Sequence, residues 1–249
     1  MKRVYSLILI FCIVIIGWGS SQAAALNDST EQCVIDFIRR LPQIDPAVIQ
    51  KEVDNFLDRS NIDESTYTAM YNLAGKYLNN LDSPMRDEEY YILFLNHAVN
   101  KGKLGEADKE RARFRLEMAE KNRPGSKAPD FRVVTREGEQ LNFLDLLSGG
   151  ENIVVFYDPD CNHCVEVMEI IENEPSLKSK RIIAIDSETD RELWNATCMK
   201  LPQDWVVGFA LDYIQDDDLF IFPEMPTIYV INGEGTIILK DASLEKIIL

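Results

Sequence analysis

Cysteine is scarce in this sequence. The 249 residues contain five cysteines, and Cys12 lies in an N-terminal segment that we expect to be removed. The mature protein would keep Cys33, Cys161, Cys164 and Cys198. Small exported domains that depend on a disulfide framework are much richer in cysteine. We therefore expect no disulfide scaffold here, and the one Cys-x-x-Cys pair suggests redox chemistry instead.

Hydrophobic runs long enough to span a membrane are also missing. The apolar stretch Val4–Trp18 is shorter than the roughly 20 residues that cross a bilayer. It follows the basic start Met1–Arg3 and precedes the mostly small residues Ser20–Ala25, which is the pattern of a secretory signal peptide. We expect cleavage of residues 1–23, a periplasmic or secreted protein, and no membrane insertion of the mature chain.

Basic residues are too few to balance the acidic ones. Lys and Arg total 26 against 42 Asp and Glu, which gives a formal net charge of −16. Removal of Lys2 and Arg3 with the signal peptide would make the mature chain more acidic still. Such a charge argues against nucleic acid and anionic membranes as partners, because both repel an acidic surface.

Residues 24–122 have a helical pattern throughout. The spacing of Asp28 and Glu31 matches a capping box and predicts the start of the first helix, and Asp45 before Pro46 predicts the start of the second. Apolar residues recur at helical spacing in five segments: Val34–Leu41, Ile49–Leu57, Tyr67–Leu78, Tyr90–Val99 and Lys103–Asn122. These segments predict a small all-α domain. We find no cluster of catalytic residue types in it.

Strands alternate with helices over residues 123–249, after the break at Arg123-Pro124-Gly125. The predicted elements are a hairpin of Phe131–Thr135 and Gln140–Phe143, buried strands at Ile153–Tyr157 and Arg181–Asp186, a helix at Glu188–Leu201, a strand at Trp205–Leu211, and a second hairpin of Thr227–Ile231 and Thr236–Leu239. This order predicts an α/β domain with a mixed central sheet flanked by helices.

The Cys-x-x-Cys pair lies where a dithiol becomes reactive. The strand ending at Tyr157 leads through a short turn into Cys161, and a helical pattern begins just after it. A helix N-terminus has unpaired N–H groups and a dipole that favour thiolate over thiol. Cys161 is therefore the expected nucleophile. Cys164, three residues further on, is within reach to attack a mixed disulfide formed on Cys161.

These residues together resemble the thioredoxin superfamily, and in particular its TlpA-type periplasmic thiol–disulfide branch. Four motifs carry the resemblance: Gly125-x-x-Ala128-Pro129-Asp130-Phe131, Gly138-x-x-Leu141, Cys161-x-x-Cys164, and Met225-Pro226-Thr227 before an apolar strand. The last resembles the cis-proline loop that faces the dithiol in this family. The resemblance implies a thioredoxin-like fold over 123–249. The helical half, 24–122, is similar to domains of unknown function that precede such domains.

The sequence departs from the family pattern at three places. Asp160 stands where a tryptophan usually precedes the first cysteine, and Val155 stands where thioredoxins keep a buried carboxylate. The dipeptide between the cysteines is Asn162-His163. A cationic His163 would stabilise the thiolate and raise the reduction potential, whereas Asp160 would act in the opposite direction. We expect both side chains to tune the pair.

The resemblance implies a thiol–disulfide oxidoreductase that exchanges disulfides with protein substrates and with an unidentified redox partner. Cys161 and Cys164 would form the redox-active disulfide, and Met225, Pro226 and Thr227 would receive an extended segment of the substrate. We expect no cofactor and no metal. The direction of electron flow and the role of the helical domain stay open.

Three other interpretations compete with this one. A peroxidase of the peroxiredoxin type needs a threonine where this chain has Asp158. A zinc site would need Cys33, Cys198 or His97 to converge on the Cys-x-x-Cys pair. In the third, the helical domain captures a partner and the protein is a non-enzymatic scaffold. If they belong to no such site, five further residues would be packed structural residues: His97, Cys33, Cys198, Trp194 and Trp205.

Overall fold

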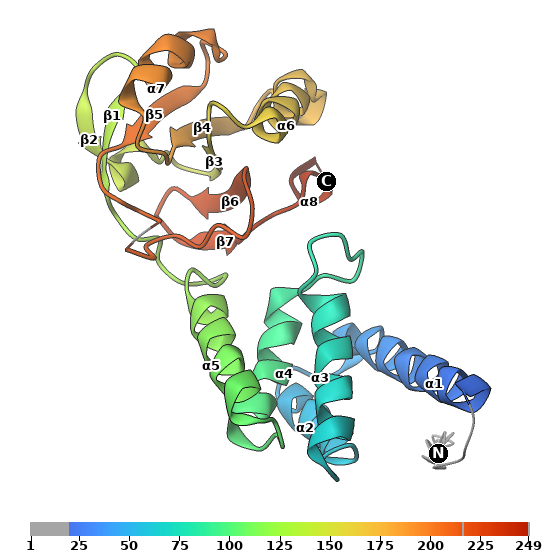
Figure 1. Ribbon diagram of the computed structural model, residues 1–249. Coiled ribbons are helices and arrows are strands. Elements are labelled where there is room, and N and C mark those ends of the chain that lie inside the picture. Colours follow the sequence, from blue (N-terminus) through green and yellow to red (C-terminus); the bar gives the residue numbers. More distant parts are fainter. Residues whose placement is uncertain (1–19, 216, 249) are drawn as a thin grey trace, which may run out of the picture. The chain divides into compact units, whose positions relative to one another are not determined.

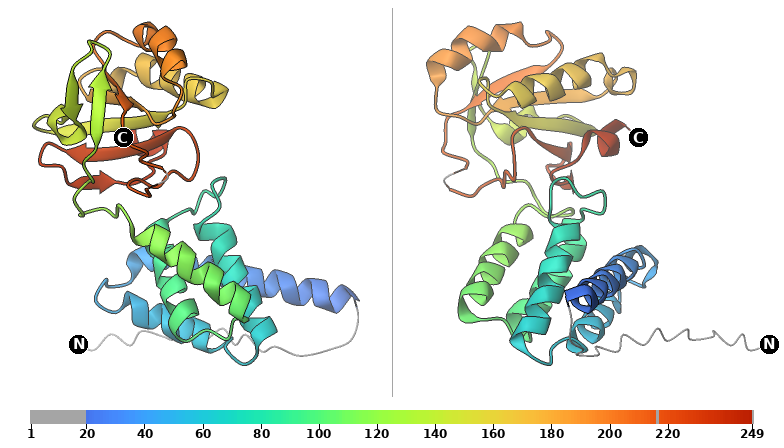
Figure 2. Two further views of the ribbon diagram at one scale, coloured as in Figure 1. Left: turned by 60° about the vertical axis from the view of Figure 1, so that its left-hand side comes forward. Right: turned by 45° about the vertical axis from the view of Figure 1, so that its right-hand side comes forward.

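The computed structural model describes residues 20–215 and 217–248. Residues 1–19, which make up most of the predicted signal peptide, lie outside the described residues. The chain divides into two compact units, Met1–Ala119 and Glu120–Leu249 (Figures 1 and 2). Each unit buries its own hydrophobic residues, in one cluster in the first unit and in two clusters in the second.

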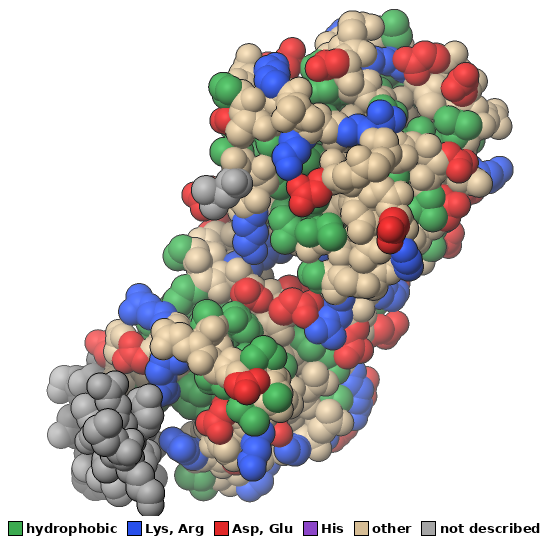
Figure 3. All heavy atoms as spheres, turned by 180° about the vertical axis from the view of Figure 1, so that it is seen from behind, with side chains coloured by type: hydrophobic (Ala, Val, Ile, Leu, Met, Phe, Trp, Pro, Cys, Tyr) green, Lys and Arg blue, Asp and Glu red, His purple; other side chains and the backbone are tan. Residues whose placement is uncertain are grey.

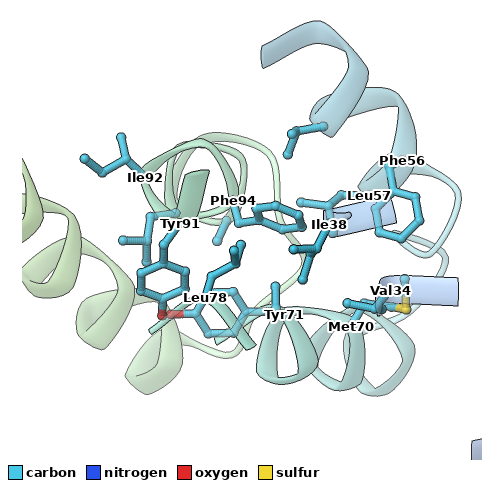
Figure 4. Close-up of a cluster of buried hydrophobic side chains, with 14 of the residues drawn as sticks. Val34, Ile38, Phe56, Leu57, Met70, Tyr71, Leu78, Tyr91, Ile92 and Phe94 are labelled. Atoms are coloured by element: carbon cyan, nitrogen blue, oxygen red, sulfur yellow. The ribbon is translucent and has the colours of Figure 1, made fainter. Parts of the chain in front are cut away.

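The first unit is helical. Its described helices are α1 (Ser20–Ile38), α2 (Ile49–Asp58), α3 (Glu64–Leu78), α4 (Glu88–Asn100) and α5 (Glu106–Glu120), with a short 3-10 turn at Leu41–Gln43. Their apolar faces meet in one core, part of which Figure 4 shows. Phe37 of α1 stacks on Phe56 of α2 with ring centroids 3.9 Å apart, and the edge of Phe94 from α4 meets Phe37. These contacts confirm the predicted all-α fold.

Two predicted helix starts in this unit are wrong. Helix α1 continues through Asp28 from Ser20, because Ala23, Ala24, Ala25 and Leu26 are all strong helix formers. Asp45 caps an isolated turn: its side chain accepts a hydrogen bond from the Ala47 N–H at 2.9 Å, and its carbonyl accepts one from the Val48 N–H at 3.0 Å. Helix α2 therefore begins only at Ile49.

The second unit is built on one mixed sheet. Its described strands are β1 (Arg132–Thr135), β2 (Gln140–Asn142), β3 (Glu151–Tyr157), β4 (Arg181–Asp186), β5 (Val206–Ala210), β6 (Thr227–Asn232) and β7 (Ile237–Leu239), in the spatial order β2-β1-β5-β4-β3-β6-β7. Strand β4 pairs in parallel with β3 and β5, and the remaining pairs are antiparallel. Both predicted hairpins are present, as β1 with β2 and β6 with β7.

The two faces of this sheet are covered differently. Helices α6 (Asn162–Asn173), α7 (Arg191–Thr197) and α8 (Leu244–Ile248) bury their apolar residues in the cluster on one face. A 3-10 turn, Phe143–Leu146, and the residues Ile214, Phe220 and Phe222 cover the other face, where several aromatic rings pack together. The predicted helix Glu188–Leu201 is shorter in the structure. It begins at Arg191, where Asp190 caps it, and it ends in a 3-10 turn, Cys198–Lys200.

Candidate active site

The sulfur of Cys161 lies at the start of helix α6. Cys161 is the N-cap residue, and its Sγ accepts a hydrogen bond from the Cys164 N–H at 3.2 Å. The preceding turn is closed by Asp158, whose carbonyl accepts from the Cys161 N–H at 3.2 Å and whose side chain accepts from the Asp160 N–H at 2.8 Å. At this position helices usually have a side-chain oxygen that accepts a hydrogen bond from a backbone N–H of the first turn. Here the sulfur of Cys161 takes that place, so a thiolate on Cys161 would be stabilised by the same N–H.

The two thiols differ sharply in exposure. Cys161 is half-buried, whereas Cys164 has no exposed surface. Burial raises the pKa of the Cys164 thiol to about 12, and the adjacent Cys161 adds to this effect, while the backbone N–H of Asp158 opposes it. Cys164 is therefore a protonated thiol at neutral pH, held beneath a more accessible one.

A proline loop faces this dithiol. The Met225–Pro226 peptide bond is cis, and β6 begins directly after it at Thr227. The Cys161 thiol points at the carbonyl oxygen of Met225, with an Sγ–O distance of 3.8 Å. Pro226 and Thr227 are buried, and the Thr227 hydroxyl donates to the Glu224 carbonyl. The fold thus brings Cys161, Cys164 and the Met225–Pro226 peptide together.

The other predicted site residues lie at the surface. His163, in the first turn of α6, and Asp160, just before Cys161, are both exposed. Among the described residues, neither the His163 side chain nor the Asp160 side chain forms a hydrogen bond with the sulfur of Cys161 or Cys164. Both cysteines are free thiols, so the predicted Cys161–Cys164 disulfide is not formed in this structure.

Sequence reasoning missed a buried polar group of three side chains on the same face of the sheet as Cys164. Tyr157 ends β3, Asp186 ends β4 and Trp194 lies in α7; they are 3%, 0% and 2% exposed. The Tyr157 hydroxyl, the Asp186 Oδ2 and the Trp194 indole N–H make no hydrogen bond to any described residue. The available signal was an aspartate directly after the apolar run Ile182–Ile185 of β4.

The residues of the competing interpretations are packed as structural residues. The His97 ring is buried between the Tyr67 hydroxyl, 2.8 Å from Nδ1, and the Asp58 carboxylate, 3.0 Å from Nε2. Cys198 is buried in the cluster that contains Cys164. Within 20–215 and 217–248, no three His, Cys, Asp or Glu side chains gather as metal ligands do.

Two surface properties bear on the partners. No helix in the described part of the chain is both long and apolar enough to cross a membrane. On the face drawn in Figure 3, Lys and Arg side chains are interspersed with Asp and Glu side chains, and the described residues there form no continuous basic surface.

A mixed sheet with a Cys-x-x-Cys helix after its inner strand β3, faced by a cis-proline loop, defines a thioredoxin-like domain. The comparisons agree with this. The chain is similar to a thioredoxin-like protein from Bacteroides caccae, with a TM-score of 0.81 and 28% identity over 94% of this chain and 86% of that one. The chain thus has a thioredoxin-like fold in its second unit, preceded by a helical domain.

The helical part has its own match. Residues 19–122 match the model of a domain of unknown function, DUF5106. Other similar solved structures cover about half of the chain. One is a conserved protein of unknown function from Bacteroides fragilis, at 32% identity over 51% of this chain and 96% of that one, with a TM-score of 0.48. Another is the thioredoxin domain of a thiol-disulfide oxidoreductase from Bacteroides vulgatus, at 18% identity over 51% of this chain and 93% of that one, with a TM-score of 0.41. No curated protein matches.

Proposed function

We propose that this protein is a thiol–disulfide oxidoreductase that exchanges disulfides with protein substrates through Cys161 and Cys164. The observation that carries the proposal is the asymmetry of the pair. Cys161 caps a helix, is partly exposed and faces the cis-proline loop, while Cys164 is buried and protonated. A structural disulfide has no need of such a difference, because neither sulfur in it has to react first.

The reaction would proceed in two displacements. The Cys161 thiolate attacks a substrate disulfide, forming a mixed disulfide and releasing one substrate thiolate. Cys164 then loses its proton and attacks the Cys161 sulfur, which forms the Cys161–Cys164 disulfide and releases the second substrate thiolate. The substrate is reduced by two electrons and the enzyme dithiol is oxidised by two. The reverse sequence oxidises a substrate dithiol.

The proline loop suits an extended protein substrate. Pro226 has no backbone N–H, so the loop can approach the sulfurs without placing a competing donor beside them. The Met225 carbonyl lies beside Cys161, and Met225 is partly exposed. A substrate segment that lies along Met225 and Pro226 would bring its sulfur towards Cys161. Thr227 would hold the loop from inside, since its side chain is buried.

We also propose that the protein works outside the cytoplasm, where disulfides persist. The basic, apolar and small-residue pattern of residues 1–23 supports this. A fusion of residues 1–30 to a reporter enzyme that is active only after export should give activity and a shortened product. An inactive, uncleaved fusion would contradict export.

Turnover of a protein disulfide tests the oxidoreductase proposal. The mature chain should catalyse reduction of a protein disulfide in the presence of a small thiol, and Cys161→Ser should abolish it. Cys164→Ser should keep the first attack and accumulate mixed disulfides. Cys33→Ser, a change at a partly buried thiol of the helical unit, is the matched control and should behave as wild type.

Two results would contradict the oxidoreductase proposal. They are a wild-type chain that does not reduce the protein disulfide, and a Cys161→Ser variant that retains the wild-type rate. The non-enzymatic scaffold would then account for the protein.

A further inference from the structure

A cavity of about 310 Å³ lies in the helical unit, among helices α3, α4 and α5 (Figure 1). The residues that line it include Tyr71, Asn72, Gly75, Asn79, Tyr91 and Arg115. None of the described residues that line it is acidic, although Asp and Glu outnumber Lys and Arg in the chain by 42 to 26. Its volume is at the small end of the range for ligand sites, so the cavity suits a small molecule.

Gly75 keeps this cavity open. It lies within α3, on the same face as Asn72 and Asn79, because residues three and four positions apart share a helix face. Its φ is not in the positive region that favours glycine, and a Cβ there would lie 3.4 Å from the Tyr91 hydroxyl, so alanine would fit. Glycine inside a helix is less favourable than alanine. Neither the backbone nor the packing therefore requires glycine at this position, whereas an open cavity does.

Arg115 is an exposed arginine at this cavity with no acidic partner. Its Nη1 donates a hydrogen bond to the Tyr71 hydroxyl at 3.3 Å. Arg111 and Arg113 of the same helix each pair with an acidic residue three positions earlier. Among the described residues, no carboxylate takes that place for Arg115. Most of its five N–H donors therefore stay available for an anion.

Two tyrosine hydroxyls meet beside this guanidinium. Figure 4 shows Tyr71 and Tyr91 with their hydroxyls turned toward each other. The Tyr71 oxygen accepts its hydrogen bond from Arg115, so the Tyr71 proton is not used in that bond. The Tyr91 hydroxyl is buried and makes no hydrogen bond to any described residue. Burial raises the pKa of Tyr91, so this hydroxyl keeps its proton at neutral pH. Hydrogen-bond donors thus gather at the cavity, and an anion complements them.

A carboxylate matches these donors better than a phosphate group does. It carries one negative charge, which one guanidinium balances, and its two oxygens fit the planar donor fork of arginine. A phosphate group carries about −1.5 to −2 charges near pH 7 and would need more than one cation. The side-chain amides of Asn72 and Asn79 each offer both a donor and an acceptor, which suits hydroxyl groups on the ligand.

We propose that the cavity in the helical unit binds a small hydroxy acid, with its carboxylate on Arg115 and Tyr71 and its hydroxyl groups on the amides of α3. The site is independent of the oxidoreductase function proposed above, because all of its residues belong to the first unit. It makes the helical domain a ligand-binding domain.

Binding of glucuronate to the full-length protein tests this proposal, with glucose as the matched neutral sugar. The two sugars share their ring hydroxyls, and glucuronate has a carboxylate where glucose has a hydroxymethyl group. Saturation-transfer NMR detects each sugar on the protein, and a titration gives its affinity. We expect glucuronate to bind about 10-fold or more tightly than glucose, because a hydrogen bond to a charged group is the stronger one. An equal concentration of inorganic phosphate should not displace it.

Three variants test whether binding occurs at this cavity. Arg115→Gln removes the charge from an exposed side chain and should weaken glucuronate binding about 10-fold or more. Gly75→Ala should also weaken binding, because its methyl group enters the cavity, while circular dichroism shows a helical unit at least as stable as in wild type. Arg113→Gln, on the same helix, is the matched control and should bind glucuronate as wild type does.

Four results would overturn the proposal. The site is wrong if wild type does not bind glucuronate, or if wild type and Arg115→Gln bind it equally. It is also wrong if Arg113→Gln weakens binding as much as Arg115→Gln does, because the effect would then be one of overall charge. Equal affinity for glucose, or displacement of glucuronate by phosphate, would overturn the choice of a carboxylate.

Discussion

Each unit buries a tyrosine near an acid, but the two units treat these groups in opposite ways. In the helical unit, His97 lies between Tyr67 and Asp58 and hydrogen-bonds both. In the thioredoxin-like unit, Tyr157 and Asp186 lie side by side on paired strands and each has an atom without a partner. A satisfied buried network contributes to stability, whereas an unsatisfied one costs stability. The first group therefore stabilises its unit, whereas the second lowers the stability of its unit.

Loss of the satisfied network should have the largest effect on stability. His97→Ala removes a buried ring and leaves the Tyr67 hydroxyl unpaired, which should lower the free energy of unfolding of the helical unit by roughly 3–4 kcal/mol. Residues 24–249 contain two tryptophans, Trp194 and Trp205, both in the second unit, so in a protein that begins at residue 24 tryptophan fluorescence follows that unit alone. Circular dichroism should show an earlier helical transition while the fluorescence transition and thiol turnover stay unchanged. A loss of thiol turnover in the folded His97→Ala variant would contradict a purely structural role for His97.

Removal of the buried charge should stabilise the second unit, and only at higher pH. The pKa of Asp186 is raised to about 7 in the folded chain, above the value of an unfolded aspartate. Below about pH 4 both states hold the proton and the group has no effect. As the pH rises to about 7, the unfolded chain ionises first, so wild type loses stability relative to an asparagine variant.

The rise in the pKa of Asp186 to about 7 corresponds to about 4 kcal/mol at most. Asp186→Asn should therefore raise the unfolding free energy by roughly 2–4 kcal/mol near pH 8 and leave it unchanged near pH 4. Denaturation followed by tryptophan fluorescence at both pH values measures this. Equal stability of the two proteins near pH 8 would mean that Asp186 is better solvated than the structure indicates.

His163 and Asp160, the exposed residues next to the two cysteines, should have a smaller effect, and it should be on the reduction potential. We expect a reduction potential above thioredoxin's value of roughly −270 mV, because a cationic His163 would stabilise the thiolate. His163→Pro should lower the potential, by about 30 mV for each ~1.4 kcal/mol of lost interaction. Asp160→Asn is the matched control with the opposite sign and should raise it. Equilibration with glutathione gives the reduction potential of each variant. A higher potential in His163→Pro than in wild type would mean that His163 does not stabilise the thiolate.

The sequence predicted the elements that bury continuous apolar runs. Arg181–Asp186 is β4 as expected, and the alternation of short strands and turns predicted both hairpins. Helix starts were harder to predict, because aspartates such as Asp28 and Asp45 can cap a helix, close a turn or lie within a longer helix, and their neighbours decide between these.

The site was predictable only where its residues are close in sequence. The spacing of Cys161 and Cys164 and the strand before them were sufficient to identify a dithiol at a helix start. Tyr157 and Asp186 are separated by a helix and a strand, and only the strand register places them side by side. Nothing in the sequence around Asp186 shows that one of its oxygens lacks a partner.

The order in which the thiols react tests the central claim most directly. The fully reduced protein is treated with limiting iodoacetamide, and mass spectrometry follows the modification of each cysteine with time. Cys161 should be alkylated before Cys164 and before buried Cys198, by roughly 100-fold or more near pH 8, because the thiolate is the reacting form. Equal rates at Cys161 and Cys164, or faster alkylation of Cys164, would contradict the account of an exposed nucleophile above a buried resolving thiol.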